Sequence, residues 1–138
     1  MDLQSIISEV KTLARETGRF IAEQRKNFDS SRVESKQSHD YVSYVDKECE
    51  RMIVSRLKEI LPQAGFITEE KTIAQDDGSK ELYWIVDPLD GTTNFIHDLA
   101  PYSVSIALRD SKELLLGVVY EVTRDELYSA AKGLGAYL

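Results

Sequence analysis

Two stretches of the chain repeat apolar residues at helical spacing. From Leu3 to Ile21 apolar side chains recur every three, four or seven residues, which predicts an amphipathic helix running to about Phe28. A second helix is predicted to end just before Pro62. One face of that helix carries Val45, Cys49, Met52, Ile53, Leu57 and Ile60. The polar residues 28–40 lack a period, so we expect a loop or mobile arm between the helices.

The second half of the chain alternates short apolar segments with turn signals. The segments are rich in β-branched and aromatic residues and predict strands at 65–68, 81–87, 102–110, 113–122 and 126–131. Connections this short require antiparallel neighbours, because a parallel crossover takes a dozen or more residues. We therefore expect one α+β domain over residues 1–138, in which two amino-terminal helices pack on a largely antiparallel sheet.

Composition and charge narrow the classes of partner. A formal net charge of −7 with no basic cluster argues against a nucleic acid as the main partner. The apolar runs are too short to span a bilayer, and the amino terminus lacks the pattern of a secretion signal, so no membrane association is expected. The single cysteine, Cys49, cannot form an internal disulfide, which favours a reducing, cytoplasmic location.

Carboxylates follow two of the predicted strands. Glu69 and Glu70 close the segment 65–68, Asp87 closes 81–87, and Asp90 follows in a turn. Burying a carboxylate is costly without a positive partner. If the two strands are neighbours, Glu70, Asp87 and Asp90 converge at one edge of the sheet, and the group suits a hard divalent cation such as Mg²⁺.

The turn after Asp90 offers groups for a phosphate. The backbone carbonyl of Leu89 is a further oxygen ligand for a cation. Gly91 allows close backbone approach, and the amides of Gly91 and Thr92 are placed to cradle a phosphate group.

Residues 87–95, Asp-Pro-Leu-Asp-Gly-Thr-Thr-Asn-Phe, resemble the D-P-x-D-G-T-x-N-F signature of the inositol monophosphatase family, and every fixed position is filled. Glu69-Glu70 resembles the family's paired glutamates, Asp46 its T-x-x-D aspartate, and Lys36 a lysine of its mobile loop. The strands and the G-x-G-A segment downstream also resemble the family. The resemblance covers almost the whole chain and implies the first half of the family's sandwich fold.

This resemblance implies a set of metal ligands and an activity. Glu70, Asp87 and the carbonyl of Leu89 would hold one Mg²⁺, and Asp87 with Asp90 would contribute to a second. Paired metal ions of this kind promote hydrolysis of phosphate esters by attack of an activated water. The expected reaction is therefore hydrolysis of a small phosphorylated polyol or sugar such as inositol monophosphate.

The resemblance also assigns residues to catalysis and substrate binding. Thr92, with Asp46 and Glu70, would position and activate the attacking water. Asp90, Gly91 and Thr92 would contact the substrate. Inositol phosphates, sugar bisphosphates such as fructose bisphosphate, and phosphoadenosine nucleotides are all substrates within the superfamily, and the ring-reading residues lie mostly in its carboxy-terminal half.

The chain departs from the family in one serious respect. Family members continue into a second half with a W-D-x-A-A/G motif, whose aspartate completes the second metal site, and residues 1–138 contain no such motif. A catalytically incomplete Mg²⁺-binding fragment or interaction module is therefore an alternative. Without a second half one face of the sheet would be uncovered, and because exposed apolar patches tend to find partners we expect a homodimer.

The same residues also allow purely structural interpretations. Asp87 to Thr92 could form an Asx-type turn that caps a helix at Thr93, and Asp46 could cap the second helix. Glu70 and Lys36 could simply be solvated. The haloacid-dehalogenase phosphatases place one residue between their acidic pair, whereas two intervene here. An EF-hand is excluded because its third position would be Leu89.

Overall fold

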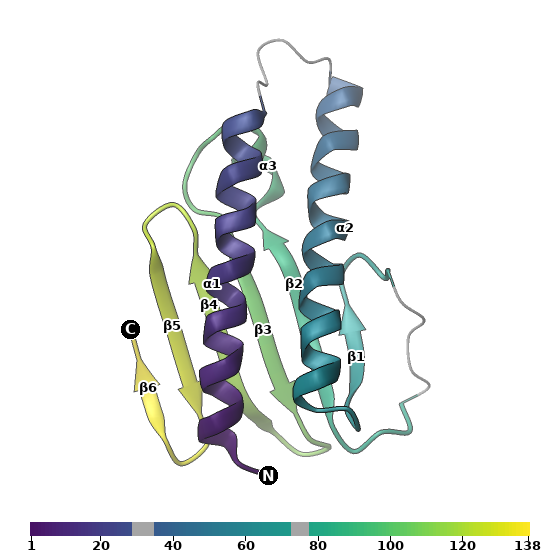
Figure 1. Ribbon diagram of the computed structural model, residues 1–138, viewed down its shortest axis with the longest axis vertical. Coiled ribbons are helices and arrows are strands. Elements are labelled where there is room, and N and C mark those ends of the chain that lie inside the picture. Colours follow the sequence, from purple (N-terminus) through teal and green to yellow (C-terminus); the bar gives the residue numbers. More distant parts are fainter. Residues whose placement is uncertain (29–34, 73–77) are drawn as a thin grey trace.

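The computed structural model describes residues 1–28, 35–72 and 78–138, with the backbone alone over 35–38. Within these residues the chain forms three helices and a six-stranded sheet (Figure 1). The helices are α1 (Leu3–Asn27), α2 (Ser35–Ile60) and α3 (Thr92–Ile96). The strands are β1 (Gly65–Thr68), β2 (Tyr83–Asp90), β3 (Ser103–Arg109), β4 (Leu114–Glu121), β5 (Glu126–Ala131) and β6 (Gly135–Tyr137).

The two long helices lie next to each other across one face of the sheet (Figure 1). The side chain of Asp2 caps α1 by accepting hydrogen bonds from the amides of Gln4 and Ser5, at 3.1 and 3.3 Å. The predicted apolar stripes of both helices face the strands, and Cys49 is fully buried among them. The α+β class and the packing of two helices on a largely antiparallel sheet are confirmed.

The second helix begins earlier than the sequence pattern predicted. Residues 35–40 were expected to belong to the polar loop, and they form the first turns of α2. The absence of an apolar period misled the prediction, because lysine and glutamine support a helix by propensity alone. Residues 29–34 of the expected arm lie outside the described residues. None of the described helices combines the length and apolar character needed to cross a membrane.

The strands follow one another across the sheet in sequence order, β1 to β6. All neighbouring pairs are antiparallel except β1 and β2, which are parallel. The expectation that every short connection forces antiparallel pairing is therefore wrong at this position. The chain between Thr68 and Tyr83 is long enough for a parallel crossover. Strand β6 was not predicted, because its three residues include a glycine and an alanine and none is buried.

Candidate active site

The parallel pairing of β1 with β2 brings the acidic strand ends together. Thr68 pairs with Val86, and the amide of Glu69 donates to the carbonyl oxygen of Val86 at 3.2 Å. Because parallel strands end at the same edge of a sheet, the chain leaves β1 at Glu69 and Glu70 beside Asp87. An antiparallel pair would have placed these residues at opposite ends of the sheet.

A bulge in β2 separates Asp87 from Asp90. Asp87 pairs with Ser105 of β3 and Asp90 with Ser103, so three steps on β2 face two on β3. Pro88 has no amide hydrogen for a ladder hydrogen bond, which is why the pairing slips here. The backbone amide of Leu89 donates to the Asp87 carboxylate. The bulge leaves Asp87 half-buried and Asp90 exposed.

Gly91 turns the chain from β2 into the short helix α3. Its backbone is left-handed, with φ +97° and ψ 44°, and its carbonyl oxygen accepts from the amide of Phe95 at 2.9 Å. The helix begins at Thr92 with Gly91 as its amino cap, and no side chain caps it. The alternative of an Asx-type turn capping a helix at Thr93 is therefore wrong. The half-buried Thr92 begins α3 directly after the acidic bulge.

Asp46 lies inside α2 rather than at its amino terminus, so its alternative role as a helix cap is also excluded. Its side chain is 6% exposed. Burial, followed by repulsion from Glu70, Asp87 and other nearby carboxylates, raises the pKa of Asp46 to about 8. A carboxyl group in this position holds its proton near neutral pH unless a cation is supplied.

The same electrostatic field acts on Glu70 and Asp87. Burial and then repulsion from Glu50 and Glu69 raise the pKa of Glu70, and Lys47 offsets part of this effect. Burial and then repulsion from Asp90 and Glu69 raise the pKa of Asp87 to about 6, although the hydrogen bond from Leu89 works in the opposite direction. The structure thus brings Asp46, Glu70, Asp87 and Asp90 into one field of negative charge.

The donor set of this cluster fits a hard divalent cation. All its side-chain donors are carboxylate oxygens, the ligands that Mg²⁺ prefers. Among the described residues no group of three His, Cys, Asp or Glu side chains lies close enough to surround an ion alone. Mg²⁺ commonly binds through one or two carboxylates and takes its remaining oxygens from water and substrate phosphate. The residues present are compatible with that mode of binding.

Glu50 belongs to the same neighbourhood, and the sequence patterns did not single it out. It is fully buried on α2, and its carboxylate accepts hydrogen bonds from the amides of Glu70 and Thr72. A sequence signal was available, since Glu50 lies one helical turn after Asp46 and next to the buried position Cys49. Lys36, whose side chain lies outside the described part of the chain, cannot be placed relative to the cluster.

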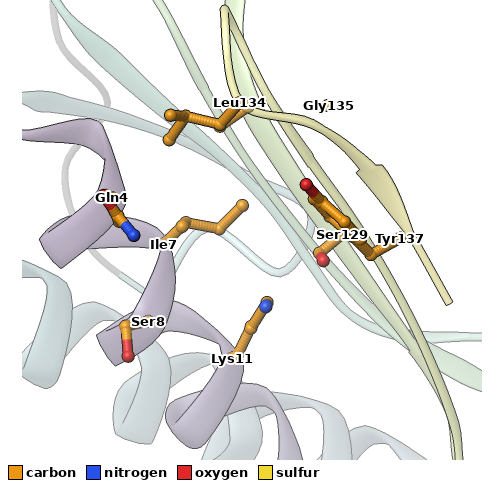
Figure 2. Close-up of a pocket in the computed structure, with 9 residues that line it drawn as sticks. Gln4, Ile7, Ser8, Lys11, Ser129, Leu134, Gly135 and Tyr137 are labelled. Atoms are coloured by element: carbon orange, nitrogen blue, oxygen red, sulfur yellow. The ribbon is translucent and has the colours of Figure 1, made fainter.

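A separate pocket of about 420 Å³ opens between α1 and the strands β5 and β6 (Figure 2). Ile7, Leu134 and Ala131 supply apolar surface, and Lys11 supplies a cation. Figure 2 shows the side chains of Lys11 and Tyr137 on opposite sides of the opening. The described residues that line this pocket include no carboxylate and none of the acidic cluster, so the two sites are distinct.

Comparison with known proteins defines the class to which this fold and cluster belong. The model of the inositol monophosphatase family matches residues 2–138. The chain therefore belongs to the inositol monophosphatase family, as the resemblance of residues 87–95 predicted.

Individual relatives carry two kinds of name. The chain is 35% identical to an inositol-1-monophosphatase of Mesorhizobium japonicum over 100% of this chain and 52% of that protein. It is 40% identical to Nus factor SuhB of Escherichia coli K12, over 91% of this chain and 46% of that protein. The crystal structure of inositol monophosphatase-II from Staphylococcus aureus matches with a TM-score of 0.81 and 32% identity, covering 96% of this chain and 48% of that one. The chain thus spans about half the length of these relatives.

Proposed function

We propose that the chain carries the amino-terminal part of the active site of a Mg²⁺-dependent phosphomonoesterase that hydrolyses a small phosphorylated polyol or sugar. The observation that supports this proposal most directly is the cluster of Asp46, Glu70 and Asp87. Burial, followed by repulsion from neighbouring carboxylates, raises the pKa of each of these three groups. Such a cluster is stabilised by the cations that a phosphatase of this family would recruit, on a protein of net charge −7.

The proposed ligands follow the family signature residue by residue. Glu70, Asp87 and the carbonyl of Leu89 would hold one Mg²⁺, and Asp87 with Asp90 would contribute to a second. Bound Mg²⁺ would neutralise the phosphate dianion and lower the pKa of water. The half-buried position of Asp87 supports its central part in this set, because Glu69 and Glu70, which follow β1, and Asp90 all act on its carboxyl group.

Other residues of the chain would orient water and substrate. The hydroxyl of Thr92 and the carboxylates of Asp46 and Glu70 would hold the attacking water by hydrogen bonds. Asp90 and the amides of Gly91 and Thr92 would contact the substrate, since the first amides of a helix have no acceptor within the helix. The left-handed backbone of Gly91 supports this arrangement, because it turns the chain sharply between the bulge and α3.

The names of the relatives favour inositol monophosphate within the substrate class. One relative is named an inositol-1-monophosphatase and one matched structure an inositol monophosphatase-II. Phosphoadenosine nucleotides and fructose bisphosphate remain alternative substrates of the same superfamily. We also propose that the protein is cytoplasmic and forms a homodimer, as the sequence predicts.

A second candidate function is that of a catalytically incomplete Mg²⁺-binding fragment or interaction module. Two observations favour it: the chain spans about half of its relatives, and several of those relatives are named Nus factor SuhB rather than after an enzyme. For the same reason the absence of a nucleic-acid partner stays a prediction, supported only by the net charge of −7.

Phosphate release from inositol 1-phosphate separates the two candidates. We expect the 138-residue chain to release phosphate with Mg²⁺ and not with a chelator, and Asp87→Asn to abolish the activity. Asp110→Asn is the matched control: Asp110 caps the β3–β4 turn by accepting from the amides of Lys112 and Glu113, far along the sheet from Asp87, and asparagine preserves such a cap. A folded chain that releases no phosphate would instead favour the incomplete fragment.

A further inference from the structure

Glu50 is a fully buried carboxylate in the middle of α2. Among the described residues no lysine or arginine forms an ion pair with it. A buried carboxyl group without a cationic partner is stable only where hydrogen-bond donors surround it. The identity of these donors therefore shows what Glu50 does in the fold.

The donors come from the segment that follows β1. One carboxylate oxygen, Oε1, accepts from the backbone amide of Glu70 at 2.8 Å. The other, Oε2, accepts from the backbone amide of Thr72 at 2.6 Å and from its hydroxyl at 2.5 Å. Glu50 thus joins α2 to the chain on both sides of Lys71.

Lys71, between the two bonded amides, has a left-handed backbone with φ +53°. This conformation is unfavourable for a residue with a side chain, and it persists where the surrounding structure holds it in place. The two amides bound by Glu50 provide such a restraint. The turn at Lys71 determines how the chain leaves β1, and so where the Glu70 side chain lies relative to Asp46 and Asp87.

We propose that Glu50 is a positioning residue for the metal site: it clamps the turn at Lys71 and thereby holds Glu70 in the acidic cluster. The role rests on the proposed function, because it concerns the residue proposed to bind Mg²⁺. Glu50 itself contacts neither metal nor substrate. Replacing a group that orients a metal ligand weakens metal binding about 10- to 100-fold, and we expect a loss in this range.

Binding of Mn²⁺ alone, measured as loss of the free-ion electron paramagnetic resonance signal, tests this role without any turnover. Glu50→Gln offers one acceptor oxygen where two are used, and Glu50→Asp keeps the charge on a shorter side chain. Both are expected to weaken Mn²⁺ binding. Glu59→Gln is the control for loss of one carboxylate from α2, since Glu59 is exposed and pairs with Arg56 at 3.1 Å. It should bind Mn²⁺ as the wild type does.

Lys71→Gly provides a rescue, because glycine adopts the left-handed turn without strain. Glu50→Gln should therefore lower the affinity for Mn²⁺ less in a Lys71→Gly chain than in the wild type. In the wild type, hydrogen exchange measured by NMR should show protected amides at Glu70 and Thr72, and protection should fall in both Glu50 variants. Exchange in the wild type needs no variant to fold.

The outcomes separate this inference from the proposed function. Rapid exchange of the Glu70 and Thr72 amides in the wild type would overturn the clamp. Wild-type Mn²⁺ affinity in a folded Glu50→Asp would show that only the charge of Glu50 matters, and would also overturn the inference. A wild-type chain that binds no Mn²⁺ while both amides are protected would overturn the proposed function, and with it this role of Glu50.

Discussion

Gly91 lies directly against Pro101: a Cβ atom on Gly91 would stand 2.8 Å from the Pro101 carbonyl oxygen. The same oxygen accepts a hydrogen bond from the side-chain amide of Asn94 at 2.8 Å. Two residues of the family signature thus approach one carbonyl group, just before the start of β3. The contact fixes α3 against the sheet, and so places Thr92 next to the acidic bulge.

The Gly91–Pro101 contact predicts that Gly91→Ala destabilises the chain. The left-handed backbone at φ +97° alone should cost about 1–3 kcal/mol, and the close approach to Pro101 adds to it. Urea denaturation gives the change in the free energy of unfolding. Gly117→Ala is the control, because a Cβ there meets nothing within 4 Å. It should be neutral or slightly stabilising, and an equal loss in the two variants would contradict the prediction.

Phe95 connects α3 to the rest of the core through aromatic contacts. It is fully buried, lies edge-on to Tyr102 with ring centroids 5.5 Å apart, and stacks on Phe28 at 6.2 Å. We expect Phe95→Ala to cost about 3–5 kcal/mol of unfolding free energy. Leu99→Ala, at a 59% exposed position shortly after it, should change stability little. Thermal unfolding of both variants checks the difference.

The helices and most strands were predictable because their burial is regular. The apolar stripe that includes Cys49 and Ile53 faces the sheet, as its period indicates. The parallel pairing of β1 with β2 could not be deduced from the pattern, because alternating burial is the same in either direction. The start of α2 at Ser35 was hidden for a different reason: the sequence of its first turns is polar and has no apolar period.

The metal-free chain should lose stability as pH rises. The pKa of Asp46 is near 3.8 in an unfolded chain and about 8 when folded. Between these values the unfolded state has released a proton that the folded state keeps, so rising pH favours unfolding. Asp87, with a folded pKa of about 6, adds to the lower part of this window. Melting temperatures in a chelator should therefore fall from pH 5 to pH 8.

Two controls assign this pH dependence to the cluster. The asparagine in Asp46→Asn cannot titrate. The melting temperature of this variant should therefore depend less on pH in the upper part of the range. Mg²⁺ at pH 8 should raise the melting temperature of the wild type, because a ligand of the folded state stabilises it. A wild type whose stability is constant from pH 5 to pH 8 would contradict the prediction.

Glu121 should show the opposite pH dependence. Burial acts to raise its pKa, but hydrogen bonds from Thr123, Arg124 and Tyr102 outweigh burial and lower it. Its contribution is present above the unfolded pKa and is lost as pH falls through the folded value. Glu121→Gln should cost about 1–3 kcal/mol at neutral pH and less in acid. Glu113→Gln, an exposed partner of Lys132, should cost about 0–1 kcal/mol.

The uncovered face of the sheet predicts self-association. Both long helices lie on the other face (Figure 1), and Ile67, Val119 and Tyr128 are exposed large apolar residues on the strands. We expect sedimentation velocity to show a dimer at high concentration, and Val119→Lys with Tyr128→Lys to shift it toward monomer. A wild type that sediments as a monomer throughout would contradict the expected homodimer.

The candidate site was predictable where the motif is continuous and hidden where it depends on contacts. The order Asp87-Pro88-Leu89-Asp90-Gly91 predicts a turn and its acidic residues from the sequence alone, but not the bulge that carries β2 on to Asp90. The clamp of Glu50 on Thr72 joins residues of two separate elements, and a glutamate beside an apolar stripe gives no sign of what it bonds. The burial of Asp46 in mid-helix was also beyond the sequence, which equally allowed a capping position.

The parallel placement of β1 has a consequence for the order of folding. Strands β2 to β6 pair antiparallel, each with the next in sequence, and β3 to β6 are joined by short turns, so their contacts are local and are expected to form early. Strand β1 can add to the sheet edge only after the long connection to β2 has closed, which is entropically slower. The acidic cluster is then assembled by the last strand to dock. Transient release of this edge strand would dismantle the cluster while the rest of the domain stays folded, so loss of metal affinity should precede global unfolding.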